Sequence, residues 1–305
     1  MTDASTKVVY AALTGNVLVA FAKFGAALLS GSSAMLTEAI HSAADTVNQL
    51  LLLVGTRRSR ARASAQHAFG HGMEIYFWTF VVAVIVLLAG GFASIWQGVR
   101  HIAAPEPIEA PLVSLGVLAL SALFEGSSLA FAYREYKRLV RGRKYRGRPV
   151  GVWRFIKLSK DPNLYESLLE DAAALVGIAF AAVGVLASSW LHLLWADGAA
   201  SVAIGLLLIA DSLVIAEATR SLIAGESVTP AVLADIRRVL KENAHLPPVS
   251  EIKTLHLGPR TILVALTIAS ERPAKGPDLA DCLKDMEARV RAADTRVRFV
   301  YFGFD

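Results

Sequence analysis

Six apolar segments run through the first two thirds of this chain, and each is long enough to cross a lipid bilayer as a helix. They lie near residues 8–29, 34–54, 75–99, 112–133, 168–191 and 197–218. About 20 apolar helical residues span the hydrocarbon core of a membrane. The composition agrees, because 54% of the residues are hydrophobic and only 19% are charged, unlike an ordinary water-soluble enzyme. The sequence therefore predicts a mainly α-helical, six-helix transmembrane bundle.

Basic residues indicate which side of the membrane each connection faces. Four arginines follow the second segment, and eleven basic residues with one acidic residue lie between Arg134 and Lys160. Loops rich in Lys and Arg stay in the cytoplasm, so we expect these two loops and both termini there. The 134–160 loop sets topology first and contacts lipid head groups second; we expect no nucleic acid partner. Short loops and the lack of a transit-like leader point to a bacterial inner membrane.

From about residue 220 the composition becomes that of a soluble protein. The pattern predicts a helix near residues 229–243, a strand near 249–257, a strand over TILVALTIAS, a helix near 278–292 and a final strand over VRFVYF. This order predicts a small α+β domain of the ferredoxin-like αββαβ kind. We therefore expect a transmembrane domain over residues 1–219 and a cytosolic domain over residues 220–305. Cys282 is the only cysteine, so any metal site must use His and carboxylates.

The second apolar segment carries an unusual stripe of polar residues. Glu38, His41, Asp45 and Asn48 follow one another at steps of three, four and three residues, which places them on one side of a helix. An ionisable residue at the bilayer centre costs roughly 2.5–3.5 kcal/mol and usually has a function. His41 and Asp45 together offer two ligands for one divalent cation. The alternative is a His–Asp hydrogen bond that only fixes helix packing.

The fifth segment can complete such a site. Asp171, with Glu170 beside it, enters the membrane at a depth that allows it to face His41 and Asp45. Together these residues make a four-coordinate site of nitrogen and oxygen ligands. Protonation competes with coordination, because the imidazole must be neutral and the carboxylates ionised to bind a metal. A proton arriving from the far side can therefore eject the ion, which is the logic of proton-coupled antiport.

Three stretches resemble the cation diffusion facilitator family of divalent-metal transporters, in the branch related to zinc transporter nine. They read SGSSAMLTEAIHSAADTVNQ, QHAFGHGMEIYFW and LLEDAAALVGI. With the order of six spans and a cytosolic domain, the resemblance covers essentially the whole chain. It implies a homodimer that exchanges cytosolic Zn2+ for protons by alternating access, with Co2+, Fe2+ or Mn2+ as alternative cargo. It also implies that the protein is not an enzyme.

The resemblance assigns metal ligands to particular positions. His41 and Asp45 match the family's ligands in the second span, and Asp171 matches the second ligand in the fifth span. Four residues before Asp171, where many members have His or Asp, this chain has Ser167. The resemblance therefore leaves the fourth ligand unassigned.

Two residues are alternatives for this fourth ligand. Glu170 lies about 100° around the helix from its neighbour and must reach sideways. Glu125 lies in the fourth span and is, alternatively, the ion-pair partner of Lys23 in the first. Glu38 and Asn48 are expected to support the site by relaying protons or orienting the imidazole, or else to pack helices through hydrogen bonds.

Histidines outside the membrane give a weaker signal. His67 and His71 match loop histidines that form a secondary metal site in some family members; the alternative is that they only contact the cytosolic domain. That domain contributes His245 and His256, without the metal-binding cluster of some members. We expect it to dimerise and to bind metal weakly or not at all.

Two other classes of function are alternatives. A membrane-embedded metal-dependent hydrolase would use His41, Asp45 and Asp171 around a metal-bound water, but the chain contains no HExxH motif and we assign no catalytic residue. A transport-inactive scaffold or metal sensor would tolerate the loss of Asp45.

Overall fold

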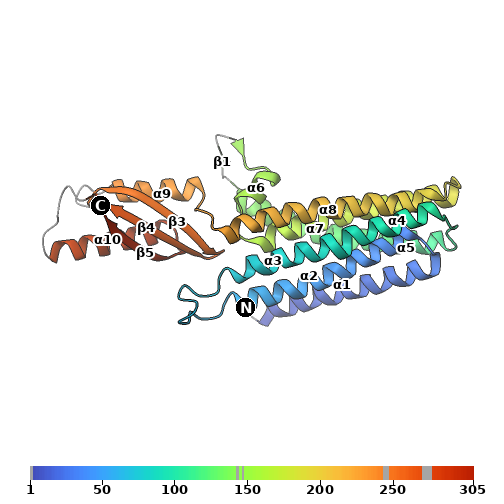
Figure 1. The fold of residues 1–305 in the computed structure, drawn as a ribbon, viewed down its shortest axis with the longest axis horizontal. Coiled ribbons are helices and arrows are strands. Elements are labelled where there is room, and N and C mark those ends of the chain that lie inside the picture. Colours follow the sequence, from blue (N-terminus) through green and yellow to red (C-terminus); the bar gives the residue numbers. More distant parts are fainter. Residues whose placement is uncertain (1–2, 142–143, 146–147, 243–246, 270–276) are drawn as a thin grey trace. The chain divides into compact units, whose positions relative to one another are not determined.

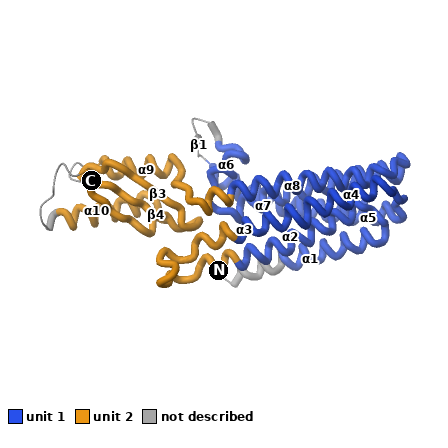
Figure 2. The backbone as a smooth tube through the Cα atoms, viewed as in Figure 1, with its two compact units in different colours: residues 1–54, 78–218 blue, residues 55–77, 219–305 orange. Residues whose placement is uncertain are grey.

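The computed structural model describes the chain except for residues 1–2, 142–143, 146–147, 243–246 and 270–276. It divides into two compact units (Figure 2). The bundle unit comprises residues 1–54 and 78–218, and the C-terminal unit comprises residues 55–77 and 219–305. The boundary near residue 219 is where the composition changes. The 55–77 segment, which the sequence places between two spans, groups with the C-terminal residues.

Long helices lying side by side form the bundle unit (Figure 1). They are α1 (Asp3–Ser30), α2 (Ser33–Arg58), α3 (Glu74–Ile85), the π-helix η1 (Val86–Phe92), α4 (Ala93–Ala103), α5 (Pro111–Val140), α7 (Pro162–Trp190) and α8 (Trp195–Ala224). The segments α3, η1 and α4 follow one another without a break and form one span.

Among the described residues, five helical segments are long and apolar enough to cross a membrane, namely Leu13–Ser30, Glu74–Ala103, Pro111–Val140, Pro162–Trp190 and Trp195–Ala224. The 26-residue α2 is also long enough, but its polar stripe lowers its hydropathy. The mainly helical membrane fold predicted from the sequence is confirmed, with five of the six predicted spans meeting this criterion among the described residues.

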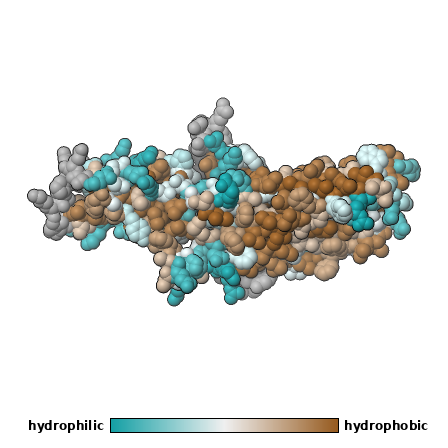
Figure 3. Space-filling view, viewed as in Figure 1, coloured by the Kyte–Doolittle hydropathy of each residue, from teal (hydrophilic) through white to brown (hydrophobic). Residues whose placement is uncertain are grey.

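The bundle exposes many large apolar side chains and has glycine at a close contact between two of its helices. Its visible face is covered by hydrophobic side chains (Figure 3), as lipid contact requires. At the contact between α4 and α8, a Cβ atom added to Gly98 would lie only 2.6 Å from the carbonyl oxygen of Gly198. Such small residues allow helix backbones to approach closely in membranes, where the hydrophobic effect does not drive helices together.

A short connection joins α5 to α7. It contains the paired strands β1 (Lys144–Tyr145) and β2 (Arg148–Pro149), followed by the helix α6 (Val152–Leu158). Asp161 then caps the N-terminus of α7 by accepting a hydrogen bond from the backbone N–H of Asn163 at 3.3 Å. This connection is the loop in which the sequence concentrates basic residues.

The C-terminal unit confirms the predicted αββαβ order. Its elements are α9 (Pro230–Lys241), β3 (Val249–Gly258), β4 (Thr261–Ile268), α10 (Pro277–Ala293) and β5 (Val297–Phe304). The sheet has the order β3-β4-β5, with β4 antiparallel to β3 and parallel to β5. Alternate residues of β4 are buried and pack in one core with Ile236 of α9 and Met286 of α10, as the period of two in a strand requires.

Candidate metal-transport site

A small cavity inside the bundle brings polar residues from three helices together. Its volume is about 10 Å³, roughly the room that one water molecule needs. The polar lining residues are His41, Asp45 and Asn48 of α2, Glu166 and Glu170 of α7, and Asp211 and Ser212 of α8. The apolar walls are Val82, Ala83, Val86 and Ile215. A cavity with this lining is suited to a small cation.

The α2 side of the cavity follows from the stripe seen in the sequence. His41, Asp45 and Asn48 are all buried. The Nδ1 atom of His41 lies 3.4 Å from Oδ1 of Asp45, but neither atom makes a hydrogen bond in the described part of the chain. The predicted pair is therefore one helical turn apart on the same wall, with its nitrogen and oxygen atoms available to a ligand.

The α7 side differs from what the family resemblance implies. Glu166 and Glu170 are one helical turn apart and both line the cavity. The Nδ2 group of Asn48 donates a hydrogen bond to Oε1 of Glu170 at 3.0 Å, so the side chain that it orients is this carboxylate. Glu166 is fully buried, and neither of its carboxylate oxygens has a hydrogen-bond partner among the described residues.

Asp171 points to a different neighbour. Its Oδ2 atom accepts a hydrogen bond of 2.8 Å from the hydroxyl of Ser128 on α5, and Asp171 is not among the residues that line the cavity. Glu125 is buried one turn before Ser128 on α5, and it does not line the cavity either. The structure thus places Glu125 and Asp171 at the contact of α5 with α7.

Lys23 finds its partner on α2. Its Nζ atom donates to Oε2 of Glu38 at 2.9 Å and to the hydroxyl of Ser42 at 2.7 Å. Lys23 and Glu38 are both fully buried. Of the roles considered for Lys23 and Glu38, the structure therefore shows an ion pair between α1 and α2, and Glu125 is not its acceptor.

The cavity gathers buried polar atoms that lack partners. Both ring nitrogens of His41, Oδ1 of Asp45, Oδ1 of Asn48 and both carboxylate oxygens of Glu166 make no hydrogen bond within the described part of the chain. Each unsatisfied buried polar group costs about 1–3 kcal/mol. Ionised carboxylates only accept hydrogen bonds, so such a cluster calls for a cation or for protons.

The ligand set is not closed around one point in this conformation. Within the described residues, no group of three or more His, Cys, Asp and Glu side chains lies close enough to hold a metal ion. The residues border one cavity without converging on one point in this conformation.

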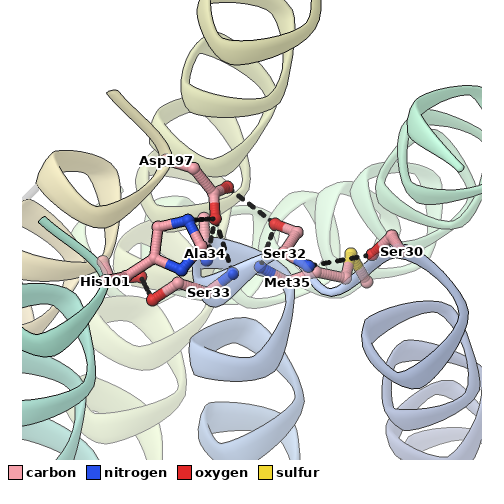
Figure 4. A network of polar contacts seen from close by, with 8 residues as sticks. Ser30, Ser32, Ser33, Ala34, Met35, His101 and Asp197 are labelled. Atoms are coloured by element: carbon pink, nitrogen blue, oxygen red, sulfur yellow. Dashed lines mark hydrogen bonds and ion pairs between the residues drawn. The ribbon is translucent and has the colours of Figure 1, made fainter. Parts of the chain in front are cut away.

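The start of α2 is fixed to α8 (Figure 4). One carboxylate oxygen of Asp197 accepts a hydrogen bond from the Ser32 hydroxyl at 2.7 Å, and the other accepts from the backbone N–H of Ser33 at 2.5 Å. The Nε2 atom of His101, at the end of α4, lies 3.7 Å from Asp197 Oδ2. A carboxylate at a helix N-terminus satisfies its free N–H groups. This cap fixes the position of α2 two turns before His41.

The loop histidines lie together in the C-terminal unit. The ring centroids of His67 and His71 are 4.3 Å apart. Phe69, which lies between the two histidines in the sequence, packs against Phe299 of β5 in a T-shaped arrangement with 5.2 Å between ring centroids. The loop therefore contacts the sheet of its own unit through Phe69, and the role of His67 and His71 stays a prediction. His256 is buried in β3, and His245 lies outside the described residues.

Glu166 and Asp211 are the cavity residues that sequence reasoning missed. The signal for Glu166 was present, since its spacing from Glu170 repeats the four-residue spacing of His41 and Asp45. The family resemblance instead assigns the ligand to Asp171, and four residues before Asp171 the chain has Ser167. Asp211 is a carboxylate within the sixth apolar segment, which is itself a signal of function, but residue spacing within one segment does not show that it lies beside α2 and α7.

Comparisons with known proteins agree with this architecture. The family model described as the cation efflux transmembrane domain matches residues 9–223. The proton-coupled zinc antiporter SLC30A9, mitochondrial, of Homo sapiens is 30% identical over 252 residues, which are 83% of this chain and 44% of the human protein. Metal tolerance protein C4 of Arabidopsis thaliana is 28% identical over 257 residues, 84% of this chain and 55% of that protein.

The match to one bacterial relative covers most of that protein's length. The manganese efflux system protein MneP of Bacillus subtilis is 24% identical over 281 residues, 90% of this chain and 88% of that protein. This chain spans less than half the length of the human relative. The resemblance noted in the sequence is confirmed: this chain is a multi-pass membrane protein that belongs to the cation efflux, or cation diffusion facilitator, family and is related to zinc transporter nine.

Proposed function

We propose that this protein moves a divalent metal cation out of the cytoplasm, with Zn2+ as the principal cargo, in exchange for protons. The proposal rests on the bundle cavity. It is lined by the side chains of His41, Asp45, Glu166 and Glu170, and several of their buried nitrogen and oxygen atoms have no hydrogen-bond partner among the described residues. One imidazole and several carboxylates suit Zn2+, which prefers four nitrogen, oxygen or sulfur ligands. The zinc antiporter named above supports this choice, and MneP supports Mn2+ as the alternative.

Proton exchange follows from the chemistry of the ligands. His41 binds a metal only when it is neutral, and Asp45, Glu166 and Glu170 bind it most strongly when they are ionised. Cation binding therefore expels protons, and protons arriving from the opposite side displace the cation. Alternating access of the cavity to the two sides couples the two movements without covalent chemistry, so we assign no enzymatic activity.

We propose His41, Asp45, Glu166 and Glu170 as the cargo ligands, with Asn48 orienting Glu170. Asp171, which the family resemblance assigns as a ligand, is held by Ser128 at 2.8 Å. For Asp171 to reach the cavity, α7 would have to rotate by about 100°, the angle between consecutive residues of a helix. The two assignments of the α7 ligands make opposite predictions.

The experiment measures flux in proteoliposomes that contain a zinc-sensitive dye and a pH-sensitive dye. We expect Zn2+ entry to be matched by proton exit in the wild type, and Asp45→Asn and Glu166→Gln each to abolish both signals. Asp171→Asn should keep most of the flux, and Ser64→Ala in the loop serves as the neutral control. Full flux in Glu166→Gln together with none in Asp171→Asn would overturn the assignment of the ligands.

Substitution of Asp45 tests the function itself. If Asp45→Asn transports Zn2+ at the wild-type rate, the cavity is not the cargo site and the scaffold or sensor reading gains support. Zn2+ flux without any proton signal would support Zn2+ transport by this protein but refute the exchange of Zn2+ for protons. Repeating the assay with Mn2+ decides which cargo the cavity prefers.

We also propose that the protein is a homodimer that assembles through the C-terminal unit. Among the described residues, the outer edges of β3 and β5 have no neighbouring strand, and Tyr301 and Phe304 of β5 are 50% and 58% exposed. Mass photometry of the full chain in detergent should give a dimer, and a monomer at every accessible concentration would refute this part of the proposal.

A further inference from the structure

The short helix α6 is held firmly against the ends of two membrane helices. Phe155 and Ile156 are buried. The Phe155 ring packs against the Tyr136 ring of α5 in a T-shaped arrangement, with 5.1 Å between centroids. The Tyr136 hydroxyl donates a hydrogen bond of 2.7 Å to the carbonyl oxygen of Val150. Leu168 of α7 belongs to the same buried cluster. These contacts fix which face of α6 turns away from the bundle.

The outward face of α6 combines an exposed aromatic ring with positive charges. It consists of Val152, Trp153, Arg154 and Lys157, all exposed, and we call it the α6 surface. Trp153 is 55% exposed, and the Lys157 ammonium group lies 5.3 Å from its ring centroid. An indole beside a flexible cation is typical of side chains at the boundary between lipid and water, where the ring and the charge each find a suitable environment.

The end of α5 repeats this combination. Tyr133 is 40% exposed, and the Lys137 ammonium group lies 4.6 Å from its ring centroid. Tyr133 contacts Tyr136 at 5.5 Å between centroids, and Tyr136 contacts α6. A chain of ring contacts therefore runs from Tyr133 through Tyr136 to Phe155 on α6, the helix that also carries Trp153.

Helix length places this region at the membrane boundary. The 30 residues of α5 extend about 45 Å at about 1.5 Å per residue, whereas the hydrocarbon core is about 30 Å thick. Counted from Pro111, about the last ten residues of α5 leave the hydrocarbon, and these include the residues that contact α6. The α6 surface therefore lies at the depth of lipid head groups.

The charge of this region selects the kind of lipid. Eleven basic residues and a single acidic residue, Glu135, lie between Arg134 and Lys160. Glu135 is already 3.7 Å from Arg138. On α5 and just after it, Arg134, Lys137, Arg138 and Arg141 are exposed, in addition to the two cations of the α6 surface. A phosphate group with a net negative charge is the complementary partner.

We propose that the α6 surface binds the head groups of anionic phospholipids in the cytoplasmic leaflet. Trp153 inserts among the head groups and anchors the helix, while Arg154 and Lys157 contact lipid phosphates. The partner is a lipid in the bilayer, since the exposed ring requires an amphipathic environment that a free phosphate does not offer. This inference depends on the membrane location and is independent of the proposed cargo.

Native mass spectrometry of the full-length protein tests the proposal. The protein is titrated in detergent with phosphatidylglycerol or with phosphatidylcholine of the same acyl chains. We expect the wild type to retain more phosphatidylglycerol. Each basic side chain near a membrane contributes about a fivefold change in affinity, so Arg154→Gln with Lys157→Gln should weaken phosphatidylglycerol binding about 30-fold and leave phosphatidylcholine binding unchanged.

A matched variant controls for the loss of charge alone. Arg237→Gln with Lys241→Gln removes two exposed positive charges from α9 and should bind phosphatidylglycerol like the wild type. In a second measurement, brominated phosphatidylglycerol should quench the tryptophan emission of the wild type more than brominated phosphatidylcholine does. The difference should disappear in Trp153→Phe.

Two results would overturn the proposal. The first is equal retention of both lipids by the wild type. The second is that the α6 double variant and the α9 double variant bind phosphatidylglycerol with the same affinity, which would make the attraction a property of total charge. Because both readouts measure lipid binding without flux, they are unaffected by failure of the transport proposal.

Discussion

Lys23 and Glu38 form an ion pair inside the bundle, and we expect the loss of either charge alone to destabilise the protein strongly. The Nζ and Oε2 atoms are 2.9 Å apart, and both side chains are fully buried. At an effective dielectric constant of about 20, two unit charges at this distance attract each other by about 6 kcal/mol. Removing one partner of a buried pair typically costs about 3–5 kcal/mol, because the other charge is left without compensation.

The perturbation is a double-mutant cycle of Lys23→Met, Glu38→Gln and the combination of both. Each single substitution should lower the free energy of unfolding by about 3–5 kcal/mol. The double variant should cost at least about 2 kcal/mol less than the sum of the two, since no unpaired charge remains. Unfolding is followed by far-ultraviolet circular dichroism as SDS is titrated into mild-detergent micelles.

A control substitution tests whether the loss in the free energy of unfolding arises because the ion pair is buried. Lys284→Met removes a lysine whose side chain is 77% exposed and 3.4 Å from Asp281, and it should change the free energy of unfolding by less than about 0.5 kcal/mol. If Lys23→Met is equally mild, or if the two substitutions inside the bundle are additive, the ion pair does not stabilise the bundle as the geometry indicates.

Three further predictions concern other parts of the chain. Gly98→Ala should lower bundle stability by about 1–3 kcal/mol, measured by the same SDS titration, because its Cβ would lie 2.6 Å from the Gly198 carbonyl oxygen and α4 must move away from α8. Asp197→Asn should cost about 1–3 kcal/mol in that assay, since the α2 cap loses its charge. Burial raises the pKa of Asp294, but hydrogen bonds and charge from Arg296 outweigh it, so this pKa is lowered overall. Its stabilising contribution is therefore present above about pH 4 and is lost as the pH falls through the folded-state pKa; hydrogen exchange of β5 should show this loss in the wild type and less of it in Asp294→Asn.

Each of these predictions has a matched control or a contrary result. Gly116→Ala on α5 places its Cβ in open space and should be neutral; an equal effect at Gly98 and Gly116 would refute the close helix approach. Asp281→Asn removes an exposed carboxylate and should leave α2 unaffected. Equal acid sensitivity of β5 in the wild type and Asp294→Asn would show that the contact with Arg296 does not set the response.

The identity of buried partners could not be read from the sequence. The sequence shows Lys23 as a cation within an apolar segment and allows Glu125 as its partner, but the way α1 packs on α2 decides for Glu38. The same limit applies to the fifth span. The sequence shows three acidic residues, Glu166, Glu170 and Asp171, within two turns, and only the rotation of α7 shows which of them turn toward His41.

Local patterns determined the elements of this protein, and tertiary packing determined its contacts. The apolar segments, the αββαβ order and the stripe of His41 and Asp45 follow from residue spacing, because helical and strand periods are properties of the backbone. The rotation of α7, the ion pair of Lys23 and the association of residues 55–77 with the C-terminal unit depend on how separate elements meet. Many rotations of an apolar helix bury similar surface, so the choice among them belongs to packing and to the few buried charges that must find a partner.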